Sequence, residues 1–368
     1  MRVGFDARLV RYPGVGRYIR NALRGLSTQP FLKLVVYVPD EGTAQQVHQM
    51  RTDWDVRVVG ARSPGIYEQW AITRLIAQDH LDLFHAPHYV VPVTTTRPIV
   101  ATIHDLALFH YPDKLNWFMR VYYGWMVRQA IHRSRIILCV SHFIAEEVHR
   151  VFKIPEAKIW VVPNSVAEHF VPPGSEAIIR FKQAYNLDRY ILFVGTWKPW
   201  KNVGRLLEAF QKVKQSGYDG ILVLAGKPAK YQLDFTDYIH RISPSVRVLG
   251  EVAESDLPVL YGAADALVMP SLYEGFGLPA LEAMACGTPV VVARAGPLPE
   301  VVGDAGVYCD PLDVDSIAHA IRTVVEAPER RVLLANSGKT RAKIFSVEKM
   351  GQLLVEAYHS ALGGQVEC

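Results

Sequence analysis

The 368-residue chain contains few cysteines and no paired cysteine motif. Its cysteines are Cys139, Cys286, Cys309 and Cys368, and no two of them have the CxxC spacing of a zinc or redox site. A disulfide framework is therefore not expected, and this cysteine usage suits a reducing cytoplasm.

Long apolar runs are also missing. No stretch approaches the ~18 uninterrupted apolar residues of a transmembrane helix. The short apolar run at the N-terminus breaks at Asp6, which does not fit a secretory signal peptide. We therefore expect a cytoplasmic protein, with any membrane contact peripheral at the inner face of the cell membrane.

The net charge of +4 is unevenly distributed along the chain. Residues 1–172 hold 20 Lys+Arg and 14 Asp+Glu, a balance of +6, whereas residues 173–368 hold 20 and 22, a balance of −2. A basic first half is compatible with an acidic acceptor or an anionic membrane surface, and equally with an ordinary solvated surface that has a small excess of arginine. No nucleic-acid partner is expected.

What the sequence does contain is a regular alternation of short apolar runs and amphipathic helical patterns, which is typical of βαβ units and parallel sheets. Strands are predicted at residues 1–5, 32–37, 56–59, 83–85, 99–103, 136–140 and 159–162, and then at 191–194, 220–225, 246–249, 266–269, 289–293 and 306–308. Helices are predicted between many of them, at residues 16–26, 67–78, 118–133, 141–152, 203–215, 253–263, 278–286 and 314–325, and at the end of the chain at 346–362.

The alternation pauses at the proline-rich segment 163–174 and then restarts. We therefore predict an α/β protein with two Rossmann-like, doubly wound domains, at residues 1–170 and 171–345. The helix within 346–368 is expected to pack back toward the first domain. Such sheets bind ligands outside the carboxyl ends of their strands, so two domains facing across a cleft would share one site.

The most informative segment is Glu274-Gly-Phe-Gly-Leu-Pro-Ala-Leu-Glu282, which follows a predicted strand. Gly275 and Gly277 have no Cβ and allow the backbone to approach a ligand closely. Pro279 fits the first turn of a helix, and Gly287 is a typical residue just beyond a helix end. The pattern predicts a helix over residues 278–286.

The N–H groups at the start of that helix favour an anion, most often a phosphate. Glu274 precedes this position and Glu282 lies about one turn inside the helix. A diphosphate held between two carboxylates that bind hydroxyl groups matches the chemistry of a sugar nucleotide.

A second motif, Gly195-Thr-Trp-Lys-Pro-Trp-Lys201, leaves the first strand of the second domain and enters a helix. Lys201 is placed to reach an anion at the strand end, although a solvated surface lysine is the alternative interpretation. Gly250 and Val252 follow another strand, where backbone amides are expected to bind a nucleotide base; this signal alone is not specific.

Two motifs in the first domain also follow strands. Gly14-Val-Gly16-Arg17 opens a helix and suits close approach to a ligand, but it is not a GxGxxG fingerprint, which argues against an NAD enzyme. His104 ends the strand at 99–103, and Asp105 is placed either to orient its ring or to contact an acceptor; the alternative is a core histidine.

His85 and His88 have a similar position after a strand. They lack a third ligand with metal-site spacing, so we interpret them as loop structure or acceptor contacts. The pair Asp313 and Asp315 occurs late in the chain, outside the expected cleft. No metal ion and no cofactor are therefore expected.

Together these motifs resemble the family 4 retaining, sugar-nucleotide-dependent glycosyltransferases with the GT-B fold. The resemblance covers nearly the whole chain and is strongest from Val246 to Ile317, where two glutamates in Tyr273-Glu-Gly-Phe-Gly-Leu-Pro-Ala-Leu-Glu match the family's motif. The segments Tyr67-Glu-Gln, His85-Ala-Pro-His and Thr102-Ile-His-Asp-Leu are similar to a bacterial subgroup that builds polysaccharide or lipopolysaccharide chains, among them mannosyltransferases.

The resemblance implies a role for each matching residue. Glu274 would contact the donor sugar at its reacting face, and Glu282 would bind the ribose hydroxyls. Lys201 would neutralise the diphosphate, His104 would lie beside the transferred sugar, and Gly16 would lie near the diphosphate. Contacts to the sugar and phosphates are expected from the backbone of Gly275, Phe276, Gly277 and Leu278. We further assign Arg17, Asp105 and His88 to the acceptor.

One position departs from the family pattern. Thr196 stands where many members carry an arginine that partners the lysine, and a threonine supplies no charge. Lys198 or Arg17 could compensate, or the diphosphate could depend on Lys201 and helix dipoles alone.

The expected reaction is transfer of a hexose, with retention of configuration and without a metal, from a nucleotide diphosphate sugar to a glycan or lipid-linked acceptor. GDP-mannose is the expected donor and UDP-glucose the alternative. A nucleotide-sugar epimerase and an inactive sugar-nucleotide-binding subunit are the competing functions.

Overall fold

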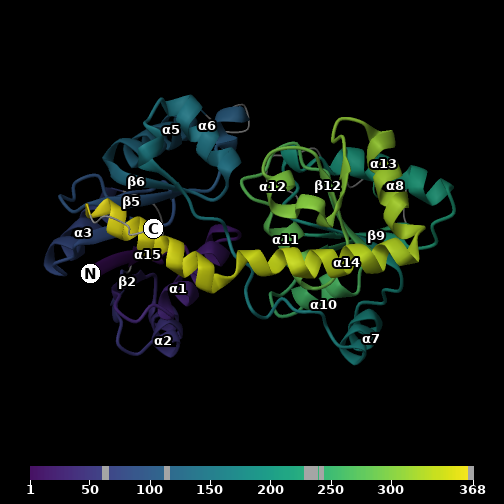
Figure 1. Cartoon of the computed structure of the whole chain (residues 1–368), viewed down its shortest axis with the longest axis horizontal. Coiled ribbons are helices and arrows are strands. Elements are labelled where there is room, and N and C mark those ends of the chain that lie inside the picture. The colour runs from purple at the N-terminus through teal and green to yellow at the C-terminus, as the bar shows by residue number, and fades with distance from the viewer. Residues whose placement is uncertain (60–65, 112–116, 228–238, 240–243, 364–368) are drawn as a thin grey trace. The chain divides into compact units, whose positions relative to one another are not determined.

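The computed structural model describes residues 1–59, 66–111, 117–227, 239 and 244–363. These residues form two compact units (Figure 1). The first consists of the chain up to Ser165 together with the C-terminal segment from Ser346, and the second runs from Val166 to Phe345. Within the described ranges no helix has the length and apolar character needed to span a bilayer. Cys139, Cys286 and Cys309 are buried free thiols, and Cys368 lies outside the described residues.

The first unit is built on a seven-stranded parallel sheet of order β3-β2-β1-β4-β5-β6-β7. Its strands are β1 (Arg2–Asp6), β2 (Lys33–Val38), β3 (Asp55–Val58), β4 (Leu83–Ala86), β5 (Ile99–Ile103), β6 (Ser134–Cys139) and β7 (Ile159–Val161). The helices are α1 (Val15–Ser27), α2 (Glu41–Met50), α3 (Ile66–Gln78), α4 (Ala107–His110), α5 (Trp117–Arg133), α6 (His142–Phe152) and α15 (Val347–Ala361).

The second unit has a six-stranded parallel sheet of order β10-β9-β8-β11-β12-β13. Its strands are β8 (Tyr190–Val194), β9 (Ile221–Ala225), β10 (Val246–Gly250), β11 (Ala266–Met269), β12 (Val290–Ala293) and β13 (Val307–Cys309). Its helices are α7 (Ser175–Ala184), α8 (Val203–Gln215), α10 (Leu257–Gly262), α11 (Leu278–Ala285), α12 (Leu298–Val302), α13 (Val314–Val325) and α14 (Pro328–Ala342).

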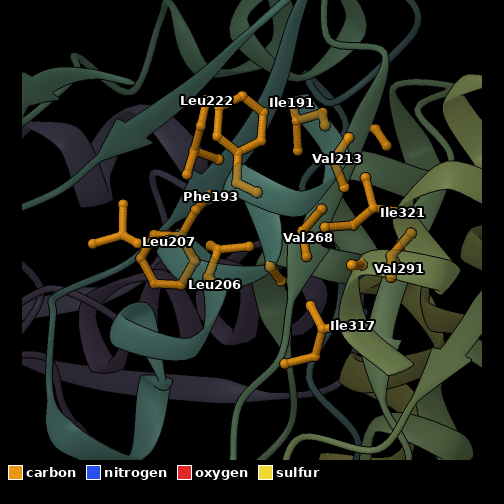
Figure 2. Packing of buried hydrophobic residues seen from close by; sticks show 14 of the residues in the cluster. Ile191, Phe193, Leu206, Leu207, Val213, Leu222, Val268, Val291, Ile317 and Ile321 are labelled. Carbon is orange, nitrogen blue, oxygen red and sulfur yellow. The ribbon is translucent and has the colours of Figure 1, made fainter. Parts of the chain in front are cut away.

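The central strands are uninterrupted apolar runs because helices cover both faces of each sheet. In the second unit, Ile191 and Phe193 of β8 pack with Leu206 of α8 and with Ile317 and Ile321 of α13 (Figure 2). This core fixes the strand ends from which the loops of the unit leave.

Helix α15 belongs to the first unit and packs along α1 (Figure 1). Two glycines permit this close approach. A Cβ on Gly25 would lie 2.2 Å from the carbonyl oxygen of Val347, and a Cβ on Gly351 would lie 2.1 Å from that of Gly25. The last helix therefore contributes directly to the core of the first unit.

Each predicted strand corresponds to an observed strand, with boundaries that differ by at most two residues. The helix predicted over 253–263 is wrong at its start, since α10 begins at Leu257 after Asp256. The sequence did not predict helices α2, α4, α7, α12 and α14. Gly287 has a φ of +78°, and it and Thr288 donate to the carbonyl oxygens of Met284 and Ala283, which closes α11 as a Schellman motif.

Candidate active site

The strand order of the second unit reverses between β8 and β11, since β9 and β10 lie on one side and β12 and β13 on the other. Such a reversal leaves a crevice between the loops that follow the two strands. The loop after β8 carries Lys201 and the loop after β11 carries Glu274. Sheet topology therefore places both predicted residues at the position where open α/β sheets bind ligands.

Lys201 and Glu274 form a direct ion pair. The Nζ of Lys201 lies 2.6 and 2.7 Å from the two carboxylate oxygens of Glu274, and the side chains are only 16% and 9% exposed. The sequence predicted both residues for the site but not this contact. Two opposite charges are thus stored side by side with little access to solvent.

Two further hydrogen bonds fix the loops that carry this pair. The N–H of Leu272 donates to the carbonyl oxygen of Trp200 at 2.7 Å, and the Asn202 side-chain amide donates to that of Pro270 at 2.9 Å. Asn202 has a left-handed φ of +62°. Within the described part of the chain, the neighbouring Ser271 hydroxyl is buried without a hydrogen-bond partner.

The turn before α11 has the predicted glycine geometry. Gly277 has a φ of +105°, and a Cβ there would lie 2.7 Å from Leu298 Cδ2. Among the described residues, none accepts a hydrogen bond from the N–H of Gly277 or Leu278, and Pro279 in the first turn has no N–H to satisfy. These two amides are therefore available to an anion.

Glu282 is buried on α11, and its Oε2 accepts a hydrogen bond from the Tyr261 hydroxyl at 2.8 Å. The carbonyl oxygen of Tyr261 in turn accepts from the hydroxyl of Thr288 at 2.7 Å. Phe276 is also buried, and its ring meets that of Phe345 edge to face at 5.6 Å. The residues around the turn are therefore held by packing and hydrogen bonds.

The carboxyl ends of β8, β9 and β10 are joined through glycines. Gly195 donates to the carbonyl oxygen of Ala225 at 2.9 Å, and Gly226 donates to that of Gly250 at 2.6 Å. Gly226 has a φ of +123°, and a Cβ there would lie 2.1 Å from the carbonyl oxygen of Gly195. Sequence reasoning selected Gly195 and Gly250 but missed Gly226, although an Ala-Gly step at the end of an apolar strand is the same signal.

Thr196 is exposed beside Gly195, so its side chain does not belong to the buried pair. Lys198 extends over the Trp200 ring, with its Nζ 5.0 Å from the ring centre. Val252 is half-buried after β10, next to an ion pair at 2.7 Å between Lys227 and Glu251.

The first unit has its own reversal of strand order, between β1 and β4. Asp6 at the end of β1 is fully buried and accepts two hydrogen bonds from the Arg8 guanidinium, at 2.8 and 2.7 Å. Burial by itself would raise the pKa of Asp6, but the charge and hydrogen bonds of Arg8 hold it below its ordinary value. The sequence contains this pair as Phe-Asp-Ala-Arg, but in the sequence alone Asp6 is only a break in an apolar run.

His88 lies against the same pair and is almost fully buried. Its Nδ1 accepts the N–H of Val90 at 2.8 Å, and its Nε2 lies 3.7 Å from Asp6. Burial lowers the pKa of His88 to about 4, so the ring is neutral near pH 7. His88 is therefore a buried residue that packs beside the Asp6–Arg8 pair at the end of β1.

His104 follows β5, as predicted, and is half-buried. Its Nε2 lies 2.8 Å from the carbonyl oxygen of Pro87, which can only accept, so Nε2 carries the proton. Burial lowers the pKa of the ring, which leaves Nδ1 as a hydrogen-bond acceptor. Tyr18 of α1 meets the ring edge to face at 4.7 Å.

Asp105 is exposed, and its Oδ1 accepts the N–H of Ala107 at 3.0 Å at the start of α4, instead of a hydrogen bond from the His104 ring. Gly16 is buried in the first turn of α1, where a Cβ would lie 2.2 Å from the carbonyl oxygen of Val10. Arg17 follows it and is half-buried. The side chains of Tyr67-Glu-Gln lie outside those that the structure describes.

The interpretation of His85 as a loop residue or acceptor contact was wrong. His85 is fully buried within β4, and its Nδ1 and Nε2 lie 2.6 and 2.9 Å from the hydroxyls of Tyr358 and Thr102. The Thr102 hydroxyl also meets that of Tyr18 at 3.0 Å. A buried chain of hydrogen bonds thus runs from α15 through two strands to α1, where Tyr18 contacts His104. No group of three metal-ligating side chains occurs in the described part of the chain.

Comparisons with known proteins agree with this arrangement. Residues 12–169 match the model of "Glycosyltransferase Family 4", and residues 174–341 match that of "Glycosyl transferases group 1". The O-antigen chain mannosyltransferase B of Escherichia coli is 30% identical over 97% of this chain and 99% of its own length. The O-antigen chain mannosyltransferase RfbU of Salmonella typhimurium is 29% identical over 72% of this chain and 71% of its own.

Solved structures share the architecture. Anabaena HepE in complex with UDP-glucose superposes with a TM-score of 0.78, at 20% identity, over 98% of this chain and all of the HepE chain. WaaG, a glycosyltransferase involved in lipopolysaccharide biosynthesis, has a TM-score of 0.74, at 14% identity, over 99% of this chain and all of its own. The two parallel sheets and these superpositions show the GT-B fold, and the chain belongs to glycosyltransferase family 4.

Proposed function

We propose that this enzyme transfers a mannosyl group from GDP-mannose to a glycan or lipid-linked acceptor in the synthesis of a cell-surface polysaccharide, with retention of configuration and without a metal ion. The observation that carries the proposal is the Lys201–Glu274 pair at the strand reversal of the second unit, beside the unbonded amides of Gly277 and Leu278. Cation, carboxylate and free amides are the groups that a sugar diphosphate requires.

Departure of the nucleotide diphosphate places negative charge on its leaving oxygen. Lys201 would exchange Glu274 for the diphosphate, and the amides at the start of α11 would stabilise the same charge. Glu274, once released by the lysine, would accept hydrogen bonds from the donor sugar. Glu282, held by Tyr261, would accept those of the ribose hydroxyls.

The neutral His104 would act through Nδ1, which can accept a hydrogen bond from a sugar hydroxyl because Nε2 is committed to Pro87. No carboxylate of this set is assigned as a covalent nucleophile. The acceptor would attack from the face that the leaving phosphate vacates, and that phosphate would take the proton of the acceptor. Charge stabilisation by Lys201 takes the part that a metal ion has in other transferases.

The choice of GDP-mannose over UDP-glucose rests on the relatives. The two O-antigen mannosyltransferases match at 30% and 29% identity, and one of them matches over nearly its full length. The UDP-glucose complex of HepE is only 20% identical, which supports the fold and not the donor.

The test is incubation of the enzyme with radiolabelled GDP-mannose or UDP-glucose and a lipid extract that supplies acceptors. We expect label transfer from GDP-mannose alone, an α-linked product by NMR, and unchanged activity after EDTA treatment. Interconversion of nucleotide sugars would support an epimerase, and binding without turnover would support an inactive subunit; either outcome contradicts the proposal. Loss of activity with EDTA would contradict metal independence.

Two variants test whether Glu274 and Glu282 have different roles. Glu274→Ala is expected to abolish transfer while donor affinity falls only a few-fold, whereas Glu282→Ala is expected mainly to weaken donor affinity. Glu329→Gln, at an exposed position on α14, is the matched control and should change neither. Equal loss of donor affinity in the first two variants would contradict this division.

A further inference from the structure

Helix α5 of the first unit is anchored along one side. Met126, Val127, Ala130 and Ile131 are buried, and the helix packs against β5, β6 and α4. Figure 1 shows α5 beside this sheet. Helices of this length normally turn only polar side chains to water. The opposite side of α5 therefore shows what this helix presents to its surroundings.

That opposite side, which we name the α5 outer face, consists of Trp117, Phe118, Val121, Trp125, Arg128 and His132. At 3.6 residues per turn these positions share one stripe of the helix. Trp117 is 76% exposed, Phe118 65%, Val121 60% and Trp125 46%. Large apolar side chains gathered in one exposed patch indicate an interaction surface, in contrast to single exposed apolar residues.

The charge of this region has one sign. Arg120, Arg128 and Arg133 are exposed on α5, and this helix contains no aspartate or glutamate. The apolar residues occupy the first half of the stripe, and Arg128 lies in the second half. Exposed tryptophan next to arginine is the composition that favours the boundary between lipid headgroups and acyl chains.

We propose that the α5 outer face docks on the surface of an anionic phospholipid bilayer, with Trp117, Phe118 and Trp125 inserted at the headgroup boundary and Arg128 paired with lipid phosphates. This inference deepens the proposed function, on which it rests, because a lipid-linked acceptor is presented at such a surface. A bilayer fits better than a protein partner, since α5 has exposed arginines and no acidic residue, which complements a uniformly anionic surface.

Flotation with vesicles tests the proposal without any requirement for activity. Wild-type enzyme is mixed with vesicles of phosphatidylcholine alone or with one third phosphatidylglycerol. We expect binding to the anionic vesicles and at least roughly tenfold weaker binding to the neutral ones, since arginines are attracted to an anionic surface. The double variant Trp117→Ala/Phe118→Ala should lose roughly tenfold or more in partition, since it removes the two most exposed aromatic side chains of the face.

Arg128→Glu should weaken binding to anionic vesicles and leave binding to neutral vesicles unchanged. The matched control is Phe31→Ala/Lys33→Glu, which removes an exposed aromatic residue and a cation from the first unit far from α5 in sequence and should bind like the wild type. Because all these side chains are exposed, circular dichroism should report the same fold.

Equal binding of the α5 variants and the wild type would overturn the proposal. Absence of vesicle binding by the wild-type protein would also overturn the proposal. This includes the case in which sedimentation experiments show that the protein self-associates through α5 instead. Mannosyl transfer to a water-soluble acceptor analogue is measured in parallel. Failure of vesicle binding with transfer intact contradicts only this inference, whereas failure of transfer with vesicle binding intact contradicts only the proposed function.

Discussion

The carboxyl ends of the two sheets have different electrostatic designs. In the second unit, Lys201 and Glu274 face each other as an ion pair next to unbonded amides. In the first unit, the charged pair Asp6–Arg8 is sealed in the core, and His88 and His104 have lowered pKa values. One strand reversal thus offers charges that can change partner, and the other offers neutral hydrogen-bonding groups.

This difference suits the two chemically distinct parts of a sugar nucleotide, the diphosphate and the sugar. A diphosphate carries charge, and it is best met by a cation and free amides. Sugar hydroxyls are neutral, and a neutral imidazole with one fixed tautomer can accept a hydrogen bond from them without binding the phosphates.

The largest effect is expected where the charge can change partner. Lys201→Ala should lower kcat by about 10²–10³, the usual cost of losing one preorganised group that stabilises transition-state charge. Glu274→Ala should also destabilise the protein, because Lys201 is then left without its partner at low exposure. Steady-state kinetics and thermal unfolding of both variants provide the measurements.

The double variant Lys201→Ala/Glu274→Ala separates pairing from catalysis. It should be more stable than the sum of the single variants implies, with a coupling of about 1–3 kcal/mol, yet remain inactive. If the changes in the free energy of unfolding of the two single variants simply added up in the double variant, the ion pair would contribute nothing to the stability of the fold. The contrast drawn between the two units would then be wrong for the second unit.

The sequence was sufficient for much of this site. Glu274, Glu282 and Lys201 could be predicted because strand ends, glycines and a proline mark their positions along the chain. Their direct contact could not be predicted, since it depends on β8 and β11 being neighbours although their first residues, Tyr190 and Ala266, are 76 positions apart in the sequence.

In the first unit the sequence was less informative. His85 and His104 both stand near strand ends in sequence, and only the strand boundaries decide that His85 is in the core and His104 at the rim. The partner of His85 is Tyr358, which belongs to the last helix of the chain. A contact between such distant segments leaves no local pattern. Asp6 and Arg8 are only two residues apart, and the sequence does not indicate that this charged pair is buried.

A further effect on stability is expected at the glycine contacts that join the carboxyl ends of β8, β9 and β10. Gly226→Ala should destabilise the second unit by about 3 kcal/mol, because its Cβ would overlap the carbonyl oxygen of Gly195 at a positive φ. Gly250→Ala is the matched control, since its φ is +70° but nothing lies within 4 Å of its Cβ, and it should cost only about 1 kcal/mol. Urea unfolding monitored by circular dichroism compares them, and equal midpoints would refute the assigned contact.

The stability of the first unit is expected to depend on pH, because two of its buried histidines have lowered pKa values. Burial lowers the pKa of His85 to about 3 and that of His88 to about 4. Both groups would take up a proton near pH 6.5 when unfolded, so their contribution to stability is complete above that pH and is lost as the pH falls from about 6.5 toward 4. We expect a loss of about 1 kcal/mol per pH unit for each of these histidines.

His85→Gln should reduce this slope. Urea midpoints at pH 7.0, 5.5 and 4.5 give the slopes. Nitrogen chemical shifts of the two rings provide an independent check that does not depend on the variants. Protonated rings at pH 5.5 in the folded protein would contradict the neutral character of this side of the comparison.

The smallest effect is expected from a single hydroxyl far from the chemistry in sequence. Tyr358→Phe removes the partner of His85 Nδ1 and should cost about 1–2 kcal/mol, since a buried polar atom is left unpaired. The hydrogen bonds from His85 through Thr102 to Tyr18, whose ring contacts His104, would position the His104 ring. If they do, kcat should also fall two- to fivefold while KM is unchanged. Tyr308→Phe, which removes a hydroxyl bonded to Gly303 in the second unit, controls for the loss of a hydroxyl and should leave kcat unaltered. A drop in stability without a drop in kcat would assign Tyr358 to the core alone and leave His104 positioned by Pro87.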